Sequence, residues 1–219
     1  MPDFSFEQRA QMPQDLFVRA PSGKILIAGI DEAGRGPWAG PVVAGAVIFP
    51  GLEISDMLAR RLNDSKKLSP GQREELFEAL QSSDALIGCG SASVEEIDRL
   101  NILQATFLAM RRAVEALSER PDFALVDGNK IPPLPCPAQA VIKGDGLSLS
   151  IAAASIVAKV TRDRLMTALA KEFPGYGWET NAGYGTKTHQ YGLKVHGICV
   201  HHRKSYAPIQ RIIAESQKN

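Results

Sequence analysis

Residues 25–49, with the sequence ILIAGIDEAGRGPWAGPVVAGAVIF, decide the fold. Two apolar runs flank a glycine-rich turn that ends at Pro37, and apolar runs of about four to eight residues bounded by Gly and Pro predict buried strands. We therefore expect a strand, a turn and a returning strand. The turn carries two adjacent carboxylates, Asp31 and Glu32, which are costly to hold near a core unless a cation meets them. A bound metal ion would supply that cation.

The size and composition of the chain fit one large domain with an appendage. With 219 residues, of which 44% are hydrophobic, the chain can bury a substantial core. We expect an N-terminal arm over residues 1–22, a core over 23–172 and a basic helical extension over 173–219. The three cysteines are far apart, no signal-peptide pattern opens the chain, and no apolar run reaches the ~18 residues that span a bilayer. These features predict a cytoplasmic protein that does not enter a membrane.

The net charge of +1 conceals two parts of opposite sign. Residues 1–127 carry 13 Lys and Arg against 19 Asp and Glu, whereas residues 128–219 carry 12 against 5 and hold all four histidines. Such an asymmetry suggests that one part offers acidic groups while the other holds a polyanion. Solvated helix faces would explain the same charges, and the charge count alone favours that simpler interpretation.

Helix and strand signals follow the hairpin along the chain. Ser69 and Gln72 form a capping-box pair around Pro70, which predicts a helix start. Ser93 and Asn101 give two more helix starts. Apolar patterns predict strands over 85–92, 123–126 and 138–142, a long helix with a small-residue face over 147–172, and short helices over 187–195 and 208–215. This order predicts a mixed sheet covered by helices.

Four carboxylates follow the ends of predicted strands, namely Asp31, Glu32, Asp127 and Asp145. Functional groups gather at such ends, because strands fix their position while the following loops leave room for a ligand. Carboxylates without His or Cys are hard ligands that suit Mg²⁺ or Mn²⁺ rather than zinc. Two such ions about 3.5–4 Å apart can hydrolyse a phosphodiester. The pattern therefore indicates phosphoryl hydrolysis.

The adjacency of Asp31 and Glu32 poses a geometric question, because neighbouring strand residues point to opposite faces of a sheet. The two side chains can share one site if the chain bends at the glycine-rich turn. Otherwise Glu32 contributes its backbone carbonyl or acts through a water. The sequence leaves these alternatives open.

Six separated motifs resemble those of ribonuclease HII, the bacterial type 2 ribonuclease H. In order they are DEAGRGPWAGPVV, DSKKLS, LVDGNK, KGDGLSLSIAAASIVAKVTRDRLM, GYGTKTH and HHRKSY, and they span roughly residues 25–206. The arginine of Gly34-Arg35-Gly36 favours this family over ribonuclease HIII. The resemblance implies an α/β fold in which a ribonuclease H-like mixed five-stranded sheet is flanked by helices and followed by a small C-terminal helical extension.

The resemblance also implies a reaction. The expected activity is endonucleolytic hydrolysis of the RNA strand of RNA·DNA hybrids, with nicking on the 5′ side of single ribonucleotides in duplex DNA to leave 5′-phosphate and 3′-hydroxyl ends. The expected partners are these nucleic acids, the expected cofactor is a pair of Mn²⁺ or Mg²⁺ ions, and a monomer is expected. The closing QRIIAESQKN does not decide whether the tail binds a replication clamp.

By resemblance, the motif residues fall into groups with different roles. The metal-binding catalytic carboxylates are Asp31, Glu32, Asp127 and Asp145. The loop that holds the ribonucleotide and senses its 2′-hydroxyl, the group that distinguishes RNA from DNA, is formed by Gly34, Arg35 and Gly36. Tyr184 corresponds to the tyrosine that stacks on the sugar following the ribonucleotide. The basic residues expected to contact phosphate or to line the substrate groove are Lys66, Lys143, Arg162, Arg203 and Lys204.

Two other functions fit parts of the pattern. A nucleic-acid-binding module of the same fold that no longer cleaves would not need the complete set of carboxylates. An unrelated metal-dependent phosphatase would not need the basic, aromatic tail. Asp163 is interpreted as an ion-pair partner of the neighbouring helix arginines rather than as a fifth ligand. His201 and His202 near Cys199 form an incomplete ligand set for zinc.

Overall fold

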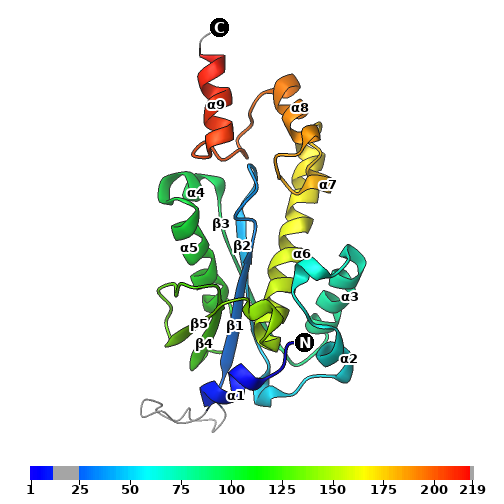
Figure 1. Cartoon of the computed structure of the whole chain (residues 1–219), viewed down its shortest axis with the longest axis vertical. Helices are drawn as coiled ribbons and strands as arrows, with labels where there is room; N and C mark the ends of the chain where they lie inside the picture. The colour runs from blue at the N-terminus through cyan, green and yellow to red at the C-terminus, as the bar shows by residue number, and fades with distance from the viewer. Residues whose placement is uncertain (12–24, 218–219) are drawn as a thin grey trace.

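A five-stranded sheet with the strand order β3-β2-β1-β4-β5 lies at the centre of the molecule. The structure is a computed structural model that describes residues 1–11 and 25–217, so residues 12–22 of the expected arm lie outside the described part. The strands are β1 (Ile27–Ala33), β2 (Val42–Ile48), β3 (Leu86–Ala92), β4 (Phe123–Asp127) and β5 (Ala138–Val141). β2 pairs antiparallel with β1 and β3, whereas β1, β4 and β5 run parallel. The predicted mixed sheet and its opening hairpin are confirmed (Figure 1).

Helices cover both faces of this sheet (Figure 1). α6 (Leu149–Glu172) packs on β1 and β2 from one side, and α5 (Ile102–Glu115), with α4 (Val94–Leu100) beside it, packs on β2 and β3 from the other. α6 approaches β1 closely because Gly29 has no side chain; a Cβ there would lie 2.1 Å from the carbonyl carbon of Ser150. The small residues 152–154 of α6 are fully buried, as their pattern predicts.

The predicted helix starts are confirmed by their capping groups. α3 (Pro70–Gln81) begins with a capping box between Ser69 and Gln72. α4 begins with a second capping box, between Ser93 and Glu96. The side chain of Asn101 accepts two backbone N–H groups at the start of α5. Each cap pairs N–H groups that the first helical turn leaves unpaired, which is worth about 1 kcal/mol.

Two segments differ from the prediction. The long helix begins at Leu149 rather than near residue 147, because the chain after β5 first forms a 3₁₀ turn, η3 (Gly144–Gly146), and Ser148 then caps α6 by accepting the N–H of Ile151. A short helix, α2 (Asp56–Arg61), follows β2 and the 3₁₀ turn η1 (Pro50–Leu52), in the stretch 50–63 where the sequence predicts a loop with at most a helical turn. Its cap, Ser55, accepts the N–H of Leu58.

The first eleven residues are tied to the start of α6. Asp3 forms an isolated β-bridge with Ser148, and α1 (Ser5–Gln11) follows it. Glu7 is fully buried, and its Oε1 accepts from Ser148 Oγ at 2.6 Å and from the N–H of Ser150 at 3.0 Å. A carboxylate at a helix N-terminus complements the helix dipole. The segment therefore fastens the residues that directly follow Asp145.

The C-terminal extension contains α7 (Trp178–Asn181), α8 (Lys187–His196) and α9 (Ala207–Ser216), which confirms the two predicted short helices. The sequence did not predict α7, a single turn between Gly177 and Ala182, both of which have left-handed backbone conformations. A shared apolar cluster joins the extension to the main body, and its buried members are Ala39, Met166, Tyr176, Trp178, Leu193 and Ile209. The boundary at residue 173 stays a prediction.

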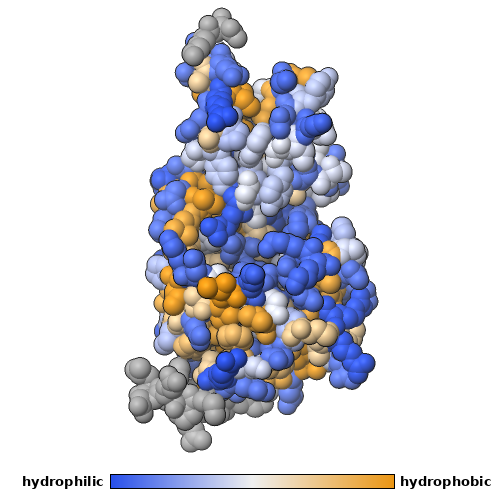
Figure 2. Space-filling model, viewed as in Figure 1, coloured by the Kyte–Doolittle hydropathy of each residue, from blue (hydrophilic) through white to orange (hydrophobic). Residues whose placement is uncertain are grey.

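The surface is unevenly polar. Figure 2 shows hydrophilic residues over the side where α3 and α6 lie and apolar residues over the region of β4 and β5. Ile142, just after β5, is 68% exposed. In residues 1–11 and 25–217, no helix combines the length and the apolar character that crossing a bilayer requires.

Candidate metal centre and nucleic-acid interface

Three aspartates meet at the carboxyl end of the parallel strands. Asp31 lies near the end of β1, and Asp127 ends β4, the parallel neighbour of β1. Asp145 lies in η3, directly after β5. Each offers a carboxylate oxygen, and these oxygens lie within 4.8 Å of one another. Among the described residues, this group has the geometry to share a metal ion.

The electrostatics of this group favour a cation. Burial, together with the charges of Glu32 and Asp127, raises the pKa of Asp31 well above its ordinary value. Burial and then the charges of Asp127 and Asp64 raise the pKa of Asp145. Hard carboxylate oxygens that share an excess of negative charge suit a divalent ion such as Mg²⁺ or Mn²⁺. The donor set therefore fits the kind of cofactor that the sequence predicts.

Glu32 lies outside the three-aspartate group. Its side chain lines a cavity of about 160 Å³ together with Arg35, Asp127 and residues of α5. Arg35 Nη1 donates to Glu32 Oε1 at 3.3 Å. Burial raises the pKa of Glu32, although Arg35 opposes the shift. Asp31 and Glu32 thus alternate across β1 as strand geometry requires, and Asp127 is the carboxylate that neighbours both.

Lys66 is a basic residue close to the carboxylates. It lies in the 3₁₀ turn η2 (Ser65–Lys67), which Asp64 caps. Partial burial lowers the pKa of Lys66, but attraction to Asp31, Asp64 and Asp145 outweighs this and raises it. Asp64 opens the DSKKLS motif and is an acidic neighbour of Asp145 that sequence reasoning missed. Lys143 is exposed, and its left-handed backbone (φ 58°) turns the chain into η3.

Arg203 holds the loop formed by Gly34, Arg35 and Gly36 from the inside. Its guanidinium donates to the carbonyl of Gly34 at 2.6 Å and to that of Arg35 at 3.0 Å. It also donates to two carbonyls on the far side of the turn, those of Gly40 and Pro41. The side chain is fully buried, so the predicted contact of Arg203 with substrate is corrected: this arginine positions the loop.

Arg162 of α6 braces the same turn. It donates to the carbonyl of Pro41 at 3.0 Å and to that of Ala182, in the extension, at 2.9 Å. Gly34 has a φ of 99°, and a Cβ there would lie 2.0 Å from Arg162 Nε, so only glycine fits. Burial and the neighbouring Arg203 lower the pKa of Arg162 to about 10, which leaves it charged at neutral pH. Arg162 is buried and does not line the predicted basic groove.

Tyr184 lies over the glycine-arginine-glycine loop. A Cβ on Gly36 would lie 3.2 Å from Cε1 of Tyr184, so ring and loop are in close contact. About half of Tyr184 is exposed (49%), as is half of the side chain of Arg35 (51%). The structure therefore brings Arg35, Gly36 and Tyr184 to one surface. Lys204 is exposed, and its N–H donates to Asp98 Oδ2 at 2.9 Å.

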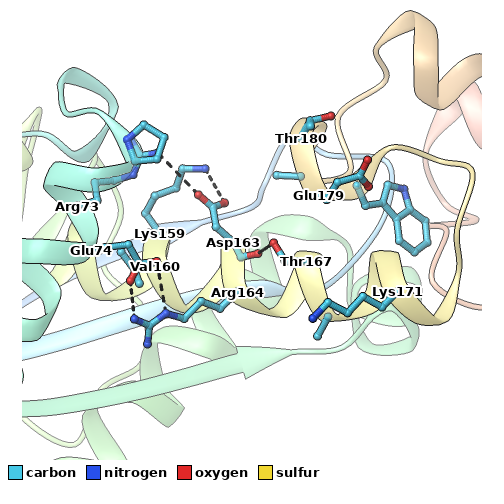
Figure 3. Close-up of a pocket in the computed structure, with 14 residues that line it drawn as sticks. Arg73, Glu74, Lys159, Val160, Asp163, Arg164, Thr167, Lys171, Glu179 and Thr180 are labelled. Atoms are coloured by element: carbon cyan, nitrogen blue, oxygen red, sulfur yellow. Dashed lines mark hydrogen bonds and ion pairs between the residues drawn. The ribbon is translucent and has the colours of Figure 1, made fainter.

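A larger cleft of about 560 Å³ lies between α3, α6 and α7 (Figure 3). The four predicted catalytic carboxylates are absent from its described lining residues. Asp163 pairs there with Lys159 at 2.7 Å and with Arg73 at 3.9 Å, and Arg164 pairs with Glu74. Asp163 is thus an ion-pair residue, but its partners are not the adjacent helix arginines that the sequence suggested. These pairs offset the positive charge of the cleft.

Known proteins resemble this chain along most of its length. The family model described as Ribonuclease HII matches residues 28–208. A ribonuclease HII of Rhodospirillum rubrum is 57% identical over 206 residues, which are 94% of this chain and 94% of that protein. The solved ribonuclease H2 of Pyrococcus horikoshii is 29% identical with a TM-score of 0.74, over 89% of this chain and 100% of that one. The ribonuclease HII of Archaeoglobus fulgidus, solved in a complex with PCNA, is 28% identical with a TM-score of 0.66, over 83% and 95% of the two chains.

Proposed function

The chain belongs to the ribonuclease HII family and is a ribonuclease H-type hydrolase, an endonuclease for RNA·DNA hybrids; from this premise we propose how it selects and cuts its substrate. It nicks duplex DNA on the 5′ side of a single embedded ribonucleotide and leaves 5′-phosphate and 3′-hydroxyl ends. The observation that carries this proposal is the placement of the three-aspartate group beside the loop of Gly34, Arg35 and Gly36, both at the end of β1.

The four carboxylates would hold two divalent ions. Asp31, Asp127 and Asp145 are close enough to ligate one ion together, and Glu32, beside Asp127, would complete the set for the second. When bound, Mg²⁺ or Mn²⁺ supplies the Lewis acidity that activates a water and the positive charge that stabilises the leaving 3′ oxygen. Both ions accept carboxylate oxygens, so the donor set supports either one.

Basic side chains would bind and orient the phosphates. Lys66 keeps its charge because the carboxylates raise its pKa, and its place next to Asp31 and Asp145 suits a contact with the scissile phosphate. Lys143, which lies two residues before Asp145, is exposed and would steady the phosphate near the ions. Lys204 is exposed as well and would contact the nucleic-acid backbone.

Recognition of the ribose would take place at the glycine-arginine-glycine loop. Gly36 has no side chain, so the backbone can approach a sugar closely. Arg35 is half exposed and pairs with Glu32. A sugar bound at this loop would therefore lie next to the carboxylates and the reacting phosphate. Tyr184, over Gly36, would stack on the following sugar and favour an RNA-to-DNA junction. The 2′-hydroxyl distinguishes this substrate from DNA.

A nicking assay tests the proposal. A DNA duplex with one ribonucleotide, incubated with Mg²⁺ or Mn²⁺, should be cut once, on the 5′ side of that residue, while the same duplex made entirely of DNA stays intact. End labelling should detect the 3′-hydroxyl and the 5′-phosphate. The alternative function, a binding module of the same fold, predicts a gel shift without product. An intact ribonucleotide duplex would therefore support the module and overturn the nuclease proposal.

A further inference from the structure

Two fully buried histidines lie behind Tyr184, and the proposed reaction does not use them. His189 belongs to α8, and His202 lies in the segment that leads to α9. Their Nε2 atoms are 3.0 Å apart. The other ring nitrogen of His189, Nδ1, lies 3.0 Å from the backbone carbonyl oxygen of Tyr184. The pair is therefore in contact with the residue assigned to the junction.

A neighbouring donor fixes the tautomer of His189. The indole N–H of Trp178 can only donate, and it points at His189 Nε2 at 3.2 Å. Nε2 must then be an acceptor, which leaves the proton of the neutral ring on Nδ1. His189 consequently donates from Nδ1 to the carbonyl of Tyr184.

A backbone group fixes the tautomer of His202 in the same way. The N–H of Cys199 can only donate, and it points at His202 Nδ1 at 3.0 Å. The proton of His202 is therefore on Nε2 and is donated to Nε2 of His189, whose single lone pair is shared between the N–H groups of Trp178 and His202. The hydrogen bonds run in one direction, from Cys199 through both rings to Tyr184.

We propose that His189 and His202 are positioning residues for junction recognition, because this one-directional chain holds the Tyr184 backbone so that its ring lies on Gly36. The inference rests on the proposed role of Tyr184. The contact that the pair maintains is the one between the ring of Tyr184 and Gly36, which is so close that a Cβ added to Gly36 would lie 3.2 Å from Cε1 of Tyr184. A shift of the Tyr184 carbonyl would move the ring that is to receive the sugar.

The surroundings keep the pair neutral. The ring of Tyr176 stacks on Trp178, with 4.9 Å between centroids, and meets His202 edge-on at 4.9 Å. Burial, together with His189, lowers the pKa of His202 to about 4, and burial lowers that of His189. Burial also raises the pKa of the Cys199 thiol and of the Tyr176 phenol. A charged His189 would have to donate from Nε2 toward the N–H group of Trp178, which already donates. A charged His202 would have to donate from Nδ1 toward the N–H group of Cys199, and it would find only the thiol sulfur of Cys199, a weak acceptor, at 3.3 Å.

The tautomers can be read directly from the unmodified full-length protein. Long-range ¹H–¹⁵N spectra of the histidine-labelled chain report which ring nitrogen carries the proton, and His189→Phe and His202→Phe assign the signals. At neutral pH we expect His189 to be protonated on Nδ1 and His202 on Nε2. A proton on Nε2 of His189, on Nδ1 of His202, or a positive charge on either ring would overturn the proposal.

The functional test compares two substrates, a duplex with one ribonucleotide and a continuous RNA·DNA hybrid. His189→Phe keeps a ring but removes the donor to Tyr184. The measured quantity is kcat/KM for the duplex with one ribonucleotide divided by kcat/KM for the continuous hybrid, and it should fall by roughly tenfold, because one buried hydrogen bond is lost. Tyr184→Ala should also lower the ratio. The double variant should be no worse than Tyr184→Ala alone, because both changes act through one ring. His196→Phe, at the exposed end of α8, is the matched control and should leave the ratio unchanged.

The outcomes separate this inference from the proposed function on which it rests. If Tyr184→Ala leaves the ratio unchanged, the junction role of Tyr184 fails and the inference fails with it. If Tyr184→Ala lowers the ratio but His189→Phe does not, or if the two effects add, only the positioning role fails. Thermal unfolding checks that His189→Phe is folded, and if it is not, the tautomers of the unmodified protein decide.

Discussion

Replacing Asp127 by asparagine should stabilise the metal-free protein while it abolishes cleavage. After burial, the charge of Asp127 is among the causes that raise the pKa of both Asp31 and Asp145, and Asp127 also lies beside Glu32. Asp127 Oδ1 accepts the N–H of Gly144 at 2.7 Å, and the amide oxygen of asparagine can accept the same bond. The substitution therefore removes the charge and preserves the local fold.

The size of the effect follows from the spacing of the carboxylates. Two unit charges separated by the 4.8 Å limit of the group repel by about 3.5 kcal/mol at an effective dielectric of ~20 and by about 0.9 kcal/mol in bulk water. We expect Asp127→Asn to raise the free energy of unfolding by ~1–3 kcal/mol in a chelator. For a chain of this size, about 2–4 °C of Tm corresponds to each kcal/mol, so the expected rise is roughly 2–12 °C.

Thermal unfolding followed by circular dichroism measures this change, first in EDTA and then with Mg²⁺ or Mn²⁺. Ions that bind the folded state should raise the Tm of the wild type and raise that of Asp127→Asn far less. Asp163→Asn is the matched control, because Asp163 pairs with Lys159 outside the metal centre; it should not gain stability in EDTA and should keep the full response to ions. The reasoning is refuted if Asp127→Asn loses stability in EDTA or retains the wild-type response to ions.

Four further predictions follow from the same contacts. The folded-state pKa values of Asp31 and Asp145 are raised, so their protonation favours folding at low pH and this contribution is lost as pH rises through those values. In EDTA the difference in unfolding free energy between the wild type and Asp127→Asn should therefore widen as the pH is raised, which denaturant titrations at several pH values measure. The pKa of His202 is lowered to about 4 in the folded protein, so between pH ~6.5 and 4 this histidine is protonated in the unfolded chain and neutral in the folded one. The free energy of unfolding should therefore fall by up to ~3 kcal/mol as the pH is lowered through this range, and denaturant titrations should show that His202→Phe removes this part of the fall. Glu7→Ala leaves Ser148 Oγ and the N–H of Ser150 without their acceptor and should cost ~1–3 kcal/mol in urea unfolding, whereas the exposed Gln8→Ala on the same helix should be neutral. Gly29→Ala would place a Cβ 2.1 Å from Ser150 and should prevent soluble expression, whereas Gly71→Ala in α3, with no atom within 4 Å, should gain ~0.5–1 kcal/mol of stability.

The features that sequence reasoning predicted depend on nearby residues or on strand order. The caps at Ser69, Ser93 and Asn101 act within three residues, so their motifs locate the helix starts. The meeting of Asp31 and Asp127 follows from the rule that parallel strands present their carboxyl ends at one edge. Both kinds of information can be read from a single sequence without knowledge of side-chain packing.

The features that escaped prediction depend on contacts between distant segments. Arginine is usually exposed, so nothing in the HHRKSY motif indicates that Arg203 is buried against carbonyls near Gly34, some 170 positions earlier in the chain. Glu7 caps a helix whose start lies more than 140 positions later. The side chain of Glu32 is different: strand alternation predicts that it faces away from Asp31, and the packing of the loop then places it in one cavity with Arg35 and Asp127.

The hydrogen bonds of Arg203 determine which way the loop of Gly34, Arg35 and Gly36 faces. A peptide unit is planar and trans, so its C=O and N–H point in opposite directions. The carbonyls of Gly34 and Arg35 are turned inward to the guanidinium, and the N–H groups of Arg35 and Gly36 must therefore point away from it. The loop therefore offers main-chain N–H donors whose direction does not depend on a side-chain rotamer. An approaching hydroxyl oxygen would be met by a surface that is already oriented, at no cost in side-chain entropy.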